Sequence, residues 1–330
     1  MLITSRTPLR VSFFGGGTDY PEYFDRLPGA VVGMAINKYV YISALKLASF
    51  IDYRYRISYS RLEKAAKVSE IEHPVVRHVL DHYKIEDALD INIIADLPAS
   101  SGLGSSSAFT VGLVNLVSAL RAQPMTRLDL GLAAIHVERN LLKERVGVQD
   151  QLHAAFGGLN RFDFVDGRIR ITPVQMRFEC QRALMTSLVL VYTGVTRYAS
   201  EVLREQVKAT QERKVDGELS HLMSLTKQSV DILEGGDPER LVQDFGVMMH
   251  DGWMTKRKLA STVTSPQIDQ LYAAAVQAGA LGGKLCGAGG GGFLLMVVPP
   301  QVRQNFNKAM TDYPLIPIVM DTHGSTIISS

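Results

Sequence analysis

A glycine- and serine-rich stretch separates two apolar segments of different spacing. Residues 98–107 are Pro-Ala-Ser-Ser-Gly-Leu-Gly-Ser-Ser-Ser. Alternating apolar residues over 89–95 predict a strand before it, and helical spacing over 113–120 predicts a helix after it. The first N–H groups of a helix lack partners within the helix and lie at the positive end of its dipole, so they readily bind phosphate. The stretch therefore predicts a phosphate loop; the alternative is a serine-capped helix after a glycine turn.

Two further segments are rich in glycine. Residues 15–19 are Gly-Gly-Gly-Thr-Asp after an apolar strand, and residues 287–292 are glycine except for Ala288. Glycine lets a backbone approach a ligand closely, but each glycine also costs chain entropy when it is ordered. The first segment is either a ligand-binding loop or a hairpin turn in which Asp19 accepts backbone N–H groups. The second is either a closely packed loop or a flexible one.

Two acidic residues occur in contexts that suggest chemistry. Glu138 falls within a long helix predicted over 126–145, and Asp150 falls in Gly-Val-Gln-Asp-Gln, residues 147–151. An Asp or Glu on a helix or loop is by default a solvated surface residue when its surroundings in the fold are not known. Composition alone leaves that alternative open for both.

The whole chain has the composition of a globular protein with room for two cores. It has 330 residues, 46% hydrophobic and 21% charged, and a net charge of +2. This balance predicts no nucleic-acid partner, since no basic stripe interleaved with aromatic residues occurs. The two cysteines, Cys180 and Cys286, define neither a disulfide framework nor a zinc pattern. No signal pattern or membrane-spanning apolar run occurs, so we expect a cytoplasmic protein without a membrane partner.

The predicted elements fall into two groups. A charge-rich stretch with Pro173 follows a predicted strand at 162–164, and we place a domain boundary there, between 1–172 and 173–330. The segment 62–84 has helical spacing broken at Pro74, and 30–47 predicts strands on either side of residues 37–38. Helical stretches over 198–215, 218–234 and 238–260 dominate the second half.

Three motifs together resemble those of the GHMP kinases. They lie at residues 10–20 (Arg-Val-Ser-Phe-Phe-Gly-x-x-Thr-Asp-Tyr), 98–106 (Pro-x-x-x-Gly-Leu-Gly-Ser-Ser) and 284–293, in the order found in that family. The resemblance implies an α+β fold with an N-terminal ribosomal S5 domain 2-like domain and a ferredoxin-like C-terminal domain. It implies an ATP-dependent phosphotransferase with an alcohol acceptor, and Mg²⁺ as its metal. Gly15-Gly16-Gly17 stands where galactokinases have Gly-Glu-His, which disfavours galactose as the substrate.

The resemblance also implies roles for individual residues. Asp150 would accept or orient the proton of the acceptor hydroxyl, with Arg10 beside it. Ser106 and Glu138 would hold Mg²⁺. The nucleotide phosphates would be bound by the phosphate loop at Ser101, Gly102, Leu103, Gly104, Ser105, Ser106 and Ser107.

Within the family, the chain is most similar to sugar 1-kinases that act on a heptose 7-phosphate. This implies transfer of phosphate to the anomeric hydroxyl of a small-molecule sugar phosphate, and a homodimer is possible. Arg197 is the first choice for the distal phosphate and Lys256 the second; alternatively, Arg197 is a solvated surface residue. The residues implied in sugar binding are Gly16, Gly17, Thr18, Asp19, Gly194, Arg197 and Gly289. Two alternatives remain: an L-fucokinase-like enzyme acting on an unphosphorylated sugar, and a ligand sensor without activity.

Overall fold

The computed structural model describes residues 2–48, 50–195 and 199–329, and within these residues the strands form two sheets. The large sheet comprises β1 (Leu2–Phe14), β2 (Gly29–Lys46), β3 (Tyr55–Ser58), β4 (Leu62–Ala65), β5 (Leu89–Ala95), β6 (Leu159–Val165), β7 (Arg168–Pro173) and β12 (Thr326–Ser329). The small sheet comprises β8 (Leu188–Tyr192), β9 (Gly282–Leu285), β10 (Phe293–Val297) and β11 (Leu315–Pro317). All strand pairs except β3 with β5 are antiparallel, and helices cover both sheets. The predicted α+β class is confirmed.

The long strands β1 and β2 form the backbone of the large sheet. Its order is β12-β1-β2-β5-β3-β4, and β6 and β7 extend it from the first half of β2. The two strands predicted around residues 37–38 are therefore one strand. Pro8 pairs with Tyr39 and Leu9 with Ile36, so residues 37–38 form a bulge, which interrupts the alternation without ending the strand.

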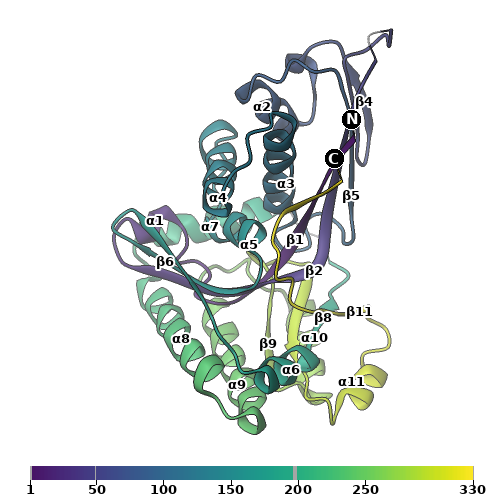
Figure 1. Cartoon of the computed structure of the whole chain (residues 1–330). Coiled ribbons are helices and arrows are strands. Elements are labelled where there is room, and N and C mark those ends of the chain that lie inside the picture. The colour runs from purple at the N-terminus through teal and green to yellow at the C-terminus, as the bar shows by residue number, and fades with distance from the viewer. Residues whose placement is uncertain (1, 49, 196–198, 330) are drawn as a thin grey trace.

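Helix α3 (Ser105–Leu120) packs against β1 and β2, with three other helices around it (Figure 1). These neighbours are α2 (Pro74–His82), α4 (Arg127–His136) and α5 (Gln149–Phe156). Most of α3 is buried, which explains why its apolar residues are not confined to one face. Its N-terminus, at the phosphate loop, is directed toward the interior of the molecule.

The small sheet is buried on both faces. Leu190 and Leu295 share a core with α6 (Phe178–Ser187) and α9 (Pro238–Lys256). Val191 and Leu294 share the other core with α10 (Pro266–Gln277) and α11 (Arg303–Ala309). Burial of both faces accounts for the unbroken apolar sequence of β10, Phe-Leu-Leu-Met-Val.

Two features of the sequence analysis are corrected by the structure. Residues 62–65 form β4, not a helix, because they pair with β3; α2 begins at Pro74, and proline is well suited to a first helical position. The helix expected over 126–145 ends as α4 at His136 and continues as one π-helical turn, Val137–Leu141. Glu138 lies in that turn.

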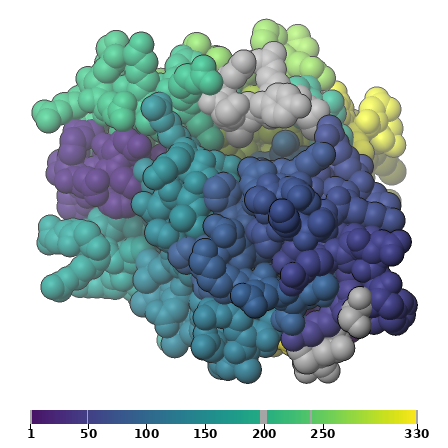
Figure 2. All heavy atoms as spheres, turned by 90° about the horizontal axis from the view of Figure 1, so that it is seen from above, coloured from purple at the N-terminus to yellow at the C-terminus, as the bar shows by residue number. Residues whose placement is uncertain are grey.

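The two halves of the chain are interlaced. The division predicted between residues 172 and 173 falls within β7, while β12 returns to pair with β1, so the N- and C-terminal ends lie close together (Figure 1). At the other end, Arg26, just after α1 (Pro21–Phe24), forms an ion pair of 3.0 Å with Asp216 at the start of α8 (Asp216–Gly235). Figure 2 shows the purple start of the chain against the green helical region of the second half. No helix in the described ranges is long and apolar enough to cross a membrane.

Two glycine-rich segments pack directly against each other and join the two halves. A Cβ placed on Gly102 would lie 2.6 Å from the carbonyl oxygen of Cys286, and one on Gly292 would lie 2.3 Å from that of Ser101. Gly102 also has a positive φ of 78°. Residues 287–292 are thus a closely packed loop against the phosphate loop.

We predict that Gly102→Ala destabilises the protein and weakens nucleotide binding. The left-handed backbone conformation alone costs an alanine about 1–2 kcal/mol, and its Cβ would also push the two loops apart. Urea unfolding and the KM for ATP measure the two effects. The matched control is Gly217→Ala in α8, where a Cβ meets no atom within 4 Å. Equal behaviour of the two variants would contradict the close packing.

Candidate functional site

A cavity of about 240 Å³ lies where the glycine-rich segments meet. It is also lined by residues of α5, α9, β9 and α7 (Ala199–Gln211). The predicted site residues that line it are Arg10, Gly16, Gly17, Asp19, Ser101, Gly102, Gly104, Ser105, Ser106, Ser107 and Asp150. Segments that are far apart in sequence therefore contribute to one cleft.

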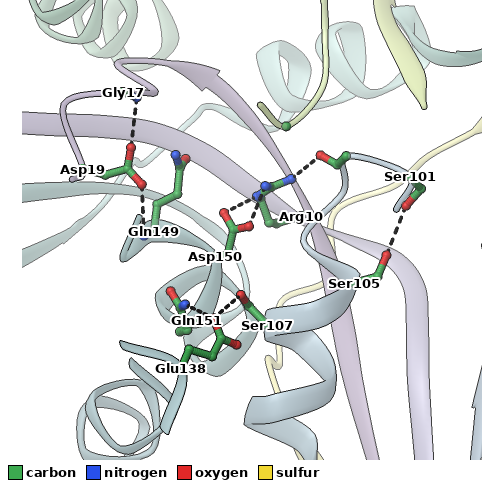
Figure 3. Close-up of polar contacts among 12 residues, drawn as sticks. Arg10, Gly17, Asp19, Ser101, Ser105, Ser107, Glu138, Gln149, Asp150 and Gln151 are labelled. Atoms are coloured by element: carbon green, nitrogen blue, oxygen red, sulfur yellow. Dashed lines mark hydrogen bonds and ion pairs between the residues drawn. The ribbon is translucent and has the colours of Figure 1, made fainter. Parts of the chain in front are cut away.

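Arg10 and Asp150, which both line this cavity, form a bidentate ion pair (Figure 3). Arg10 Nε and Nη2 donate to the two oxygens of Asp150 at 2.8 and 2.7 Å, and Nη1 donates to Gly102 O at 2.7 Å. Burial by itself lowers the pKa of Arg10, but the carboxylate of Asp150 outweighs it and the net pKa is raised. Arg10 thus stays charged and holds the carboxylate of Asp150 in a fixed orientation.

The phosphate loop ends at the start of α3. Gly104 is the N-cap residue with φ 75°, and a Cβ there would lie 3.2 Å from Arg10 Cγ. Residues 105–107 form the first helical turn and line the cavity. Their N–H groups have no acceptor within the helix, so this end of α3 can bind an anion.

Glu138 and Ser107 form a buried polar group below the loop (Figure 3). Glu138 Oε2 accepts from Ser107 Oγ at 3.0 Å and from Gln151 Nε2 at 2.6 Å. Its Oε1 has no hydrogen-bond partner of good geometry in the described part of the chain. Burial raises the pKa of Glu138 to about 7 and outweighs the nearby hydroxyl of Thr110, which lowers it. Ser106 is exposed toward the cleft, so Ser107 is the serine that contacts Glu138.

These groups fit a hard divalent cation. A buried carboxylate oxygen without a partner, next to serine hydroxyls, offers the oxygen ligands that Mg²⁺ takes. The described residues contain no cluster of three His, Cys, Asp or Glu side chains that could hold a metal by themselves. Mg²⁺ commonly binds through one or two carboxylates together with water and substrate phosphates, so a sparse protein contribution is compatible with it.

The segment 15–19 is held rigidly around Asp19. Asp19 Oδ1 accepts from Gly17 N at 3.0 Å, and Oδ2 accepts from Gln149 N at 3.4 Å. Burial raises the pKa of Asp19. A Cβ on Gly147 would lie 2.0 Å from Asp19 Oδ2, so the segment before Asp150 needs glycine to pass this carboxylate.

The remaining predicted residues do not line the cavity. Leu103 is a core residue, and Thr18 Oγ1 donates to Gly15 O in its own loop and to Ala30 O in β2. Gly194 is exposed, and a Cβ placed on it would meet no atom within 4 Å. Gly289 packs against Val263. Glu138 lies just behind the cavity wall. Arg197 lies outside the described residues.

The cavity is also lined by residues that were not predicted individually, although most of them lie within the sequence motifs. These cavity-lining residues are Ser12, Ser100, Tyr20, Val146, Gly147, Gln149, Leu203, Gln206, Lys284, Gly287 and Ala288. Lys256, expected as a second choice for a phosphate, also lines the cavity. Lys284 is the first residue of the third motif, 284–293, which is the sequence signal that could have indicated it.

Two models of a known protein family match the chain. The model of the GHMP kinases N-terminal domain matches residues 61–158, and that of the GHMP kinases C-terminal domain matches residues 233–312. The chain is similar to the D-glycero-alpha-D-manno-heptose 7-phosphate kinase of Campylobacter jejuni, with 27% identity over 93% of both chains. It is 24% identical to the bifunctional fucokinase/GDP-fucose pyrophosphorylase of Arabidopsis thaliana, over 88% of this chain and 29% of that protein.

Solved structures show the same fold. The structure of a D-glycero-D-manno-heptose 1-phosphate kinase from Bacteriodes thetaiotaomicron has a TM-score of 0.81 over 99% of both chains, at 24% identity. A galactokinase from Lactococcus lactis, complexed with galactose, has a TM-score of 0.75 over 100% of this chain and 95% of its own. The two-domain architecture expected from the motifs is therefore confirmed.

We predict that Glu138→Gln stabilises the protein at high pH but not at low pH. The unfolded carboxyl ionises near 4.5 and the folded one near 7. Between these values only the folded state holds the proton, so the stability of the wild type falls as the pH rises. At 1.36 kcal/mol per pKa unit, the loss approaches about 3 kcal/mol above pH 7.

Urea unfolding in the presence of a chelator, at pH 5 and pH 8, measures this difference. The free energy of unfolding of Glu138→Gln should exceed that of the wild type only at pH 8. The exposed residue Glu86 provides the control substitution Glu86→Gln. A constant difference between Glu138→Gln and the wild type at both pH values would contradict the raised pKa.

Proposed function

We propose that this chain, which belongs to the GHMP kinase family, phosphorylates the anomeric hydroxyl of D-glycero-D-manno-heptose 7-phosphate to give the 1,7-bisphosphate. As a family member it is an ATP-dependent phosphotransferase that acts on an alcohol group. The observation that carries the catalytic part is the Arg10–Asp150 pair next to the phosphate loop. The similarity to the heptose kinase of Campylobacter jejuni over 93% of both chains supports the substrate.

Phosphoryl transfer needs alignment of donor and acceptor and stabilisation of charge more than covalent catalysis. The N–H groups at the start of α3 bind the β- and γ-phosphates of ATP. Asp150 accepts a hydrogen bond from the anomeric hydroxyl and takes its proton as the oxygen attacks the γ-phosphorus. The bond between the γ-phosphorus and the β–γ bridging oxygen breaks, and ADP leaves. Arg10 keeps the carboxylate oriented toward the acceptor and offsets negative charge that develops during transfer.

Glu138, Ser106 and Ser107 are the residues that would hold Mg²⁺. When bound, the ion neutralises phosphate charge and helps to orient the nucleotide. Gln151 donates to Glu138 Oε2 and so fixes the carboxylate, which leaves Oε1 available.

The loop at residues 15–19 binds the sugar. Gly16, Gly17 and Asp19 face the cavity, and Asp19 is held by backbone donors in one orientation. A fixed, buried carboxylate is a strong acceptor for sugar hydroxyls. Thr18 supports this loop through its hydrogen bonds to Gly15 O and Ala30 O, whereas Gly194 and Gly289 do not line the cavity.

One other GHMP activity has specific support. The fucokinase of Arabidopsis thaliana and an L-fucokinase of Bacteroides fragilis match most of this chain. An enzyme of that kind would phosphorylate an unphosphorylated sugar. A ligand sensor without activity is disfavoured because Arg10, Asp150 and Glu138 are all present and close to the phosphate loop.

ADP release from MgATP, measured with a panel of acceptors, tests the proposed substrate. The panel contains the heptose 7-phosphate, mannose 6-phosphate, mannose, fucose and galactose. Turnover of the heptose phosphate alone supports the proposal. Turnover of only a free sugar rejects it in favour of a fucokinase-like activity, and no turnover with intact ATP binding favours a sensor.

We predict that Asp150→Asn lowers kcat by about 10²–10⁴-fold, the usual contribution of a general base. The KM for ATP should change little because Asp150 does not belong to the phosphate loop. Steady-state kinetics with ADP detection measures both constants. Asp81→Asn, at an exposed ion pair in α2, is the control. An unchanged kcat in Asp150→Asn would remove this carboxylate from the mechanism.

A further inference from the structure

Two lysines of the second half of the chain reach into the same cavity. Lys256 is the last residue of α9 and Lys284 lies in β9. They are 7% and 8% exposed, and both line the cavity. Lysine is almost never so deeply buried without a partner of opposite charge.

Neither lysine has such a partner in the described residues, whose ion pairs all involve other groups. Lys256 Nζ donates to Leu285 O at 2.9 Å and to Gly287 O. Lys284 Nζ donates to Phe13 O at 3.0 Å. An ammonium has three donors, so one remains on Lys256 and two remain on Lys284.

Their surroundings disfavour the charged forms. Burial lowers the pKa of Lys284 to about 8, and burial together with the charge of Lys284 lowers the pKa of Lys256 well below its ordinary value. Backbone carbonyls compensate a buried charge only in part. A bound anion would offset this burial and favour the charged ammonium form of both lysines.

The charges that line the cavity do not balance. Asp150 neutralises Arg10 through the bidentate pair. Two ammonium groups then remain against one further carboxylate, that of Asp19, which has no ion pair with either lysine in the described residues. One net positive charge remains, and it attracts an anionic ligand in a way that it does not attract a neutral sugar.

The position of Lys284 indicates that its ammonium group binds the acceptor sugar phosphate, not the nucleotide. Its ammonium is bonded to Phe13 in β1, the strand that leads directly into the sugar loop at residues 15–19. The nucleotide phosphates already have the unpaired N–H groups at the start of α3. The two lysines come from α9 and β9, not from that helix.

We propose that Lys256 and Lys284 together form a subsite for the phosphate group of the acceptor sugar phosphate. This rests on the proposed function, since it requires a phosphorylated acceptor. Lys256, the second choice from the sequence for the distal phosphate, then binds that phosphate together with Lys284. Arg197 is not needed for this subsite. Charge-assisted hydrogen bonds to two ammonium groups would select a phosphorylated sugar over its unphosphorylated analogue.

The test uses Lys256→Met and Lys284→Met in the full-length protein. Methionine keeps much of the side-chain length, and replacing an unpaired buried charge with an apolar group is often neutral or stabilising, so both variants should fold. Lys258→Met is the matched control, because Lys258 is exposed in the same segment. Urea unfolding confirms that all three variants are folded.

The first measurement is steady-state kinetics with the heptose 7-phosphate. A lost hydrogen bond between charged groups costs about 1.5–3 kcal/mol, which corresponds to a rise of about 10–100-fold in the KM for the sugar phosphate. The KM for ATP should stay within about twofold of the wild type. A rise in the KM for ATP without one for the sugar phosphate would instead assign the lysines to the nucleotide, and no change in either would make them structural; both results overturn the proposal.

The second measurement separates the subsite from the proposed substrate. Calorimetry measures the binding of inorganic phosphate while a non-hydrolysable ATP analogue fills the nucleotide site. Phosphate should bind the wild type and Lys258→Met, and binding should weaken at least about tenfold in the other two variants. Unchanged phosphate affinity overturns the subsite whichever sugar is the substrate. Lost phosphate affinity together with a wild type that does not use the heptose phosphate would instead reject the proposed substrate and keep the subsite.

Discussion

The fork of a single guanidinium fixes the geometry of the site. Arg10 belongs to β1, bonds the carboxylate of Asp150 in α5, and bonds the carbonyl of Gly102 in the phosphate loop. Its backbone N–H also donates to Leu103 O at 3.0 Å. The planar, bidentate shape of arginine makes this possible, and lysine could not replace it because a point charge cannot set the carboxylate plane. The separation between the proposed base and the phosphate loop thus depends on one side chain.

The second constraint is the packing of backbone against backbone. Gly102 and Gly287 approach so closely that a Cβ on Gly287 would lie 2.7 Å from the Cα of Gly102. The loop that contains Gly287 is in turn tied to Val263 by the Gly290 N–H, 2.9 Å from Val263 O. Close by, Glu205 of α7 accepts from Ser261 and Thr262. A continuous chain of contacts therefore connects α7 to the phosphate loop, which explains how Leu203 and Gln206 of α7 come to line the cavity.

The sequence predicted those parts of the site that are encoded locally. The three glycine-rich segments and the strand and helix around the phosphate loop could be recognised because glycine spacing and apolar period are local signals. The choice between Ser106 and Ser107 as the neighbour of Glu138 could not be made, since neighbouring helical residues differ by about 100° in direction and the phase depends on where the helix starts. That start is set by Gly104 at a positive φ, a property of the folded loop.

Other features depend on partners distant in the sequence. The segment at 62–65 becomes a strand because β3 pairs with it, and the bulge at residues 37–38 is defined by the register of β1 against β2. Lys284 belongs to the third motif, but its burial could not be predicted locally, because Phe13, its hydrogen-bond partner, is 271 residues away. Tertiary pairing of this kind overrides local propensity.

The cavity also shows how the protein distributes its unfavourable charges. Glu138 keeps an unpartnered carboxylate oxygen on one side of the phosphate loop, and Lys256 and Lys284 keep uncompensated ammonium groups in the cleft. Each has a pKa displaced toward its neutral form by burial. Packing alone would favour apolar residues at all three positions. A cation beside Glu138 and an anion beside the lysines would remove these costs together, so the residues that destabilise the empty cleft are those suited to stabilise a charged substrate bound with its nucleotide.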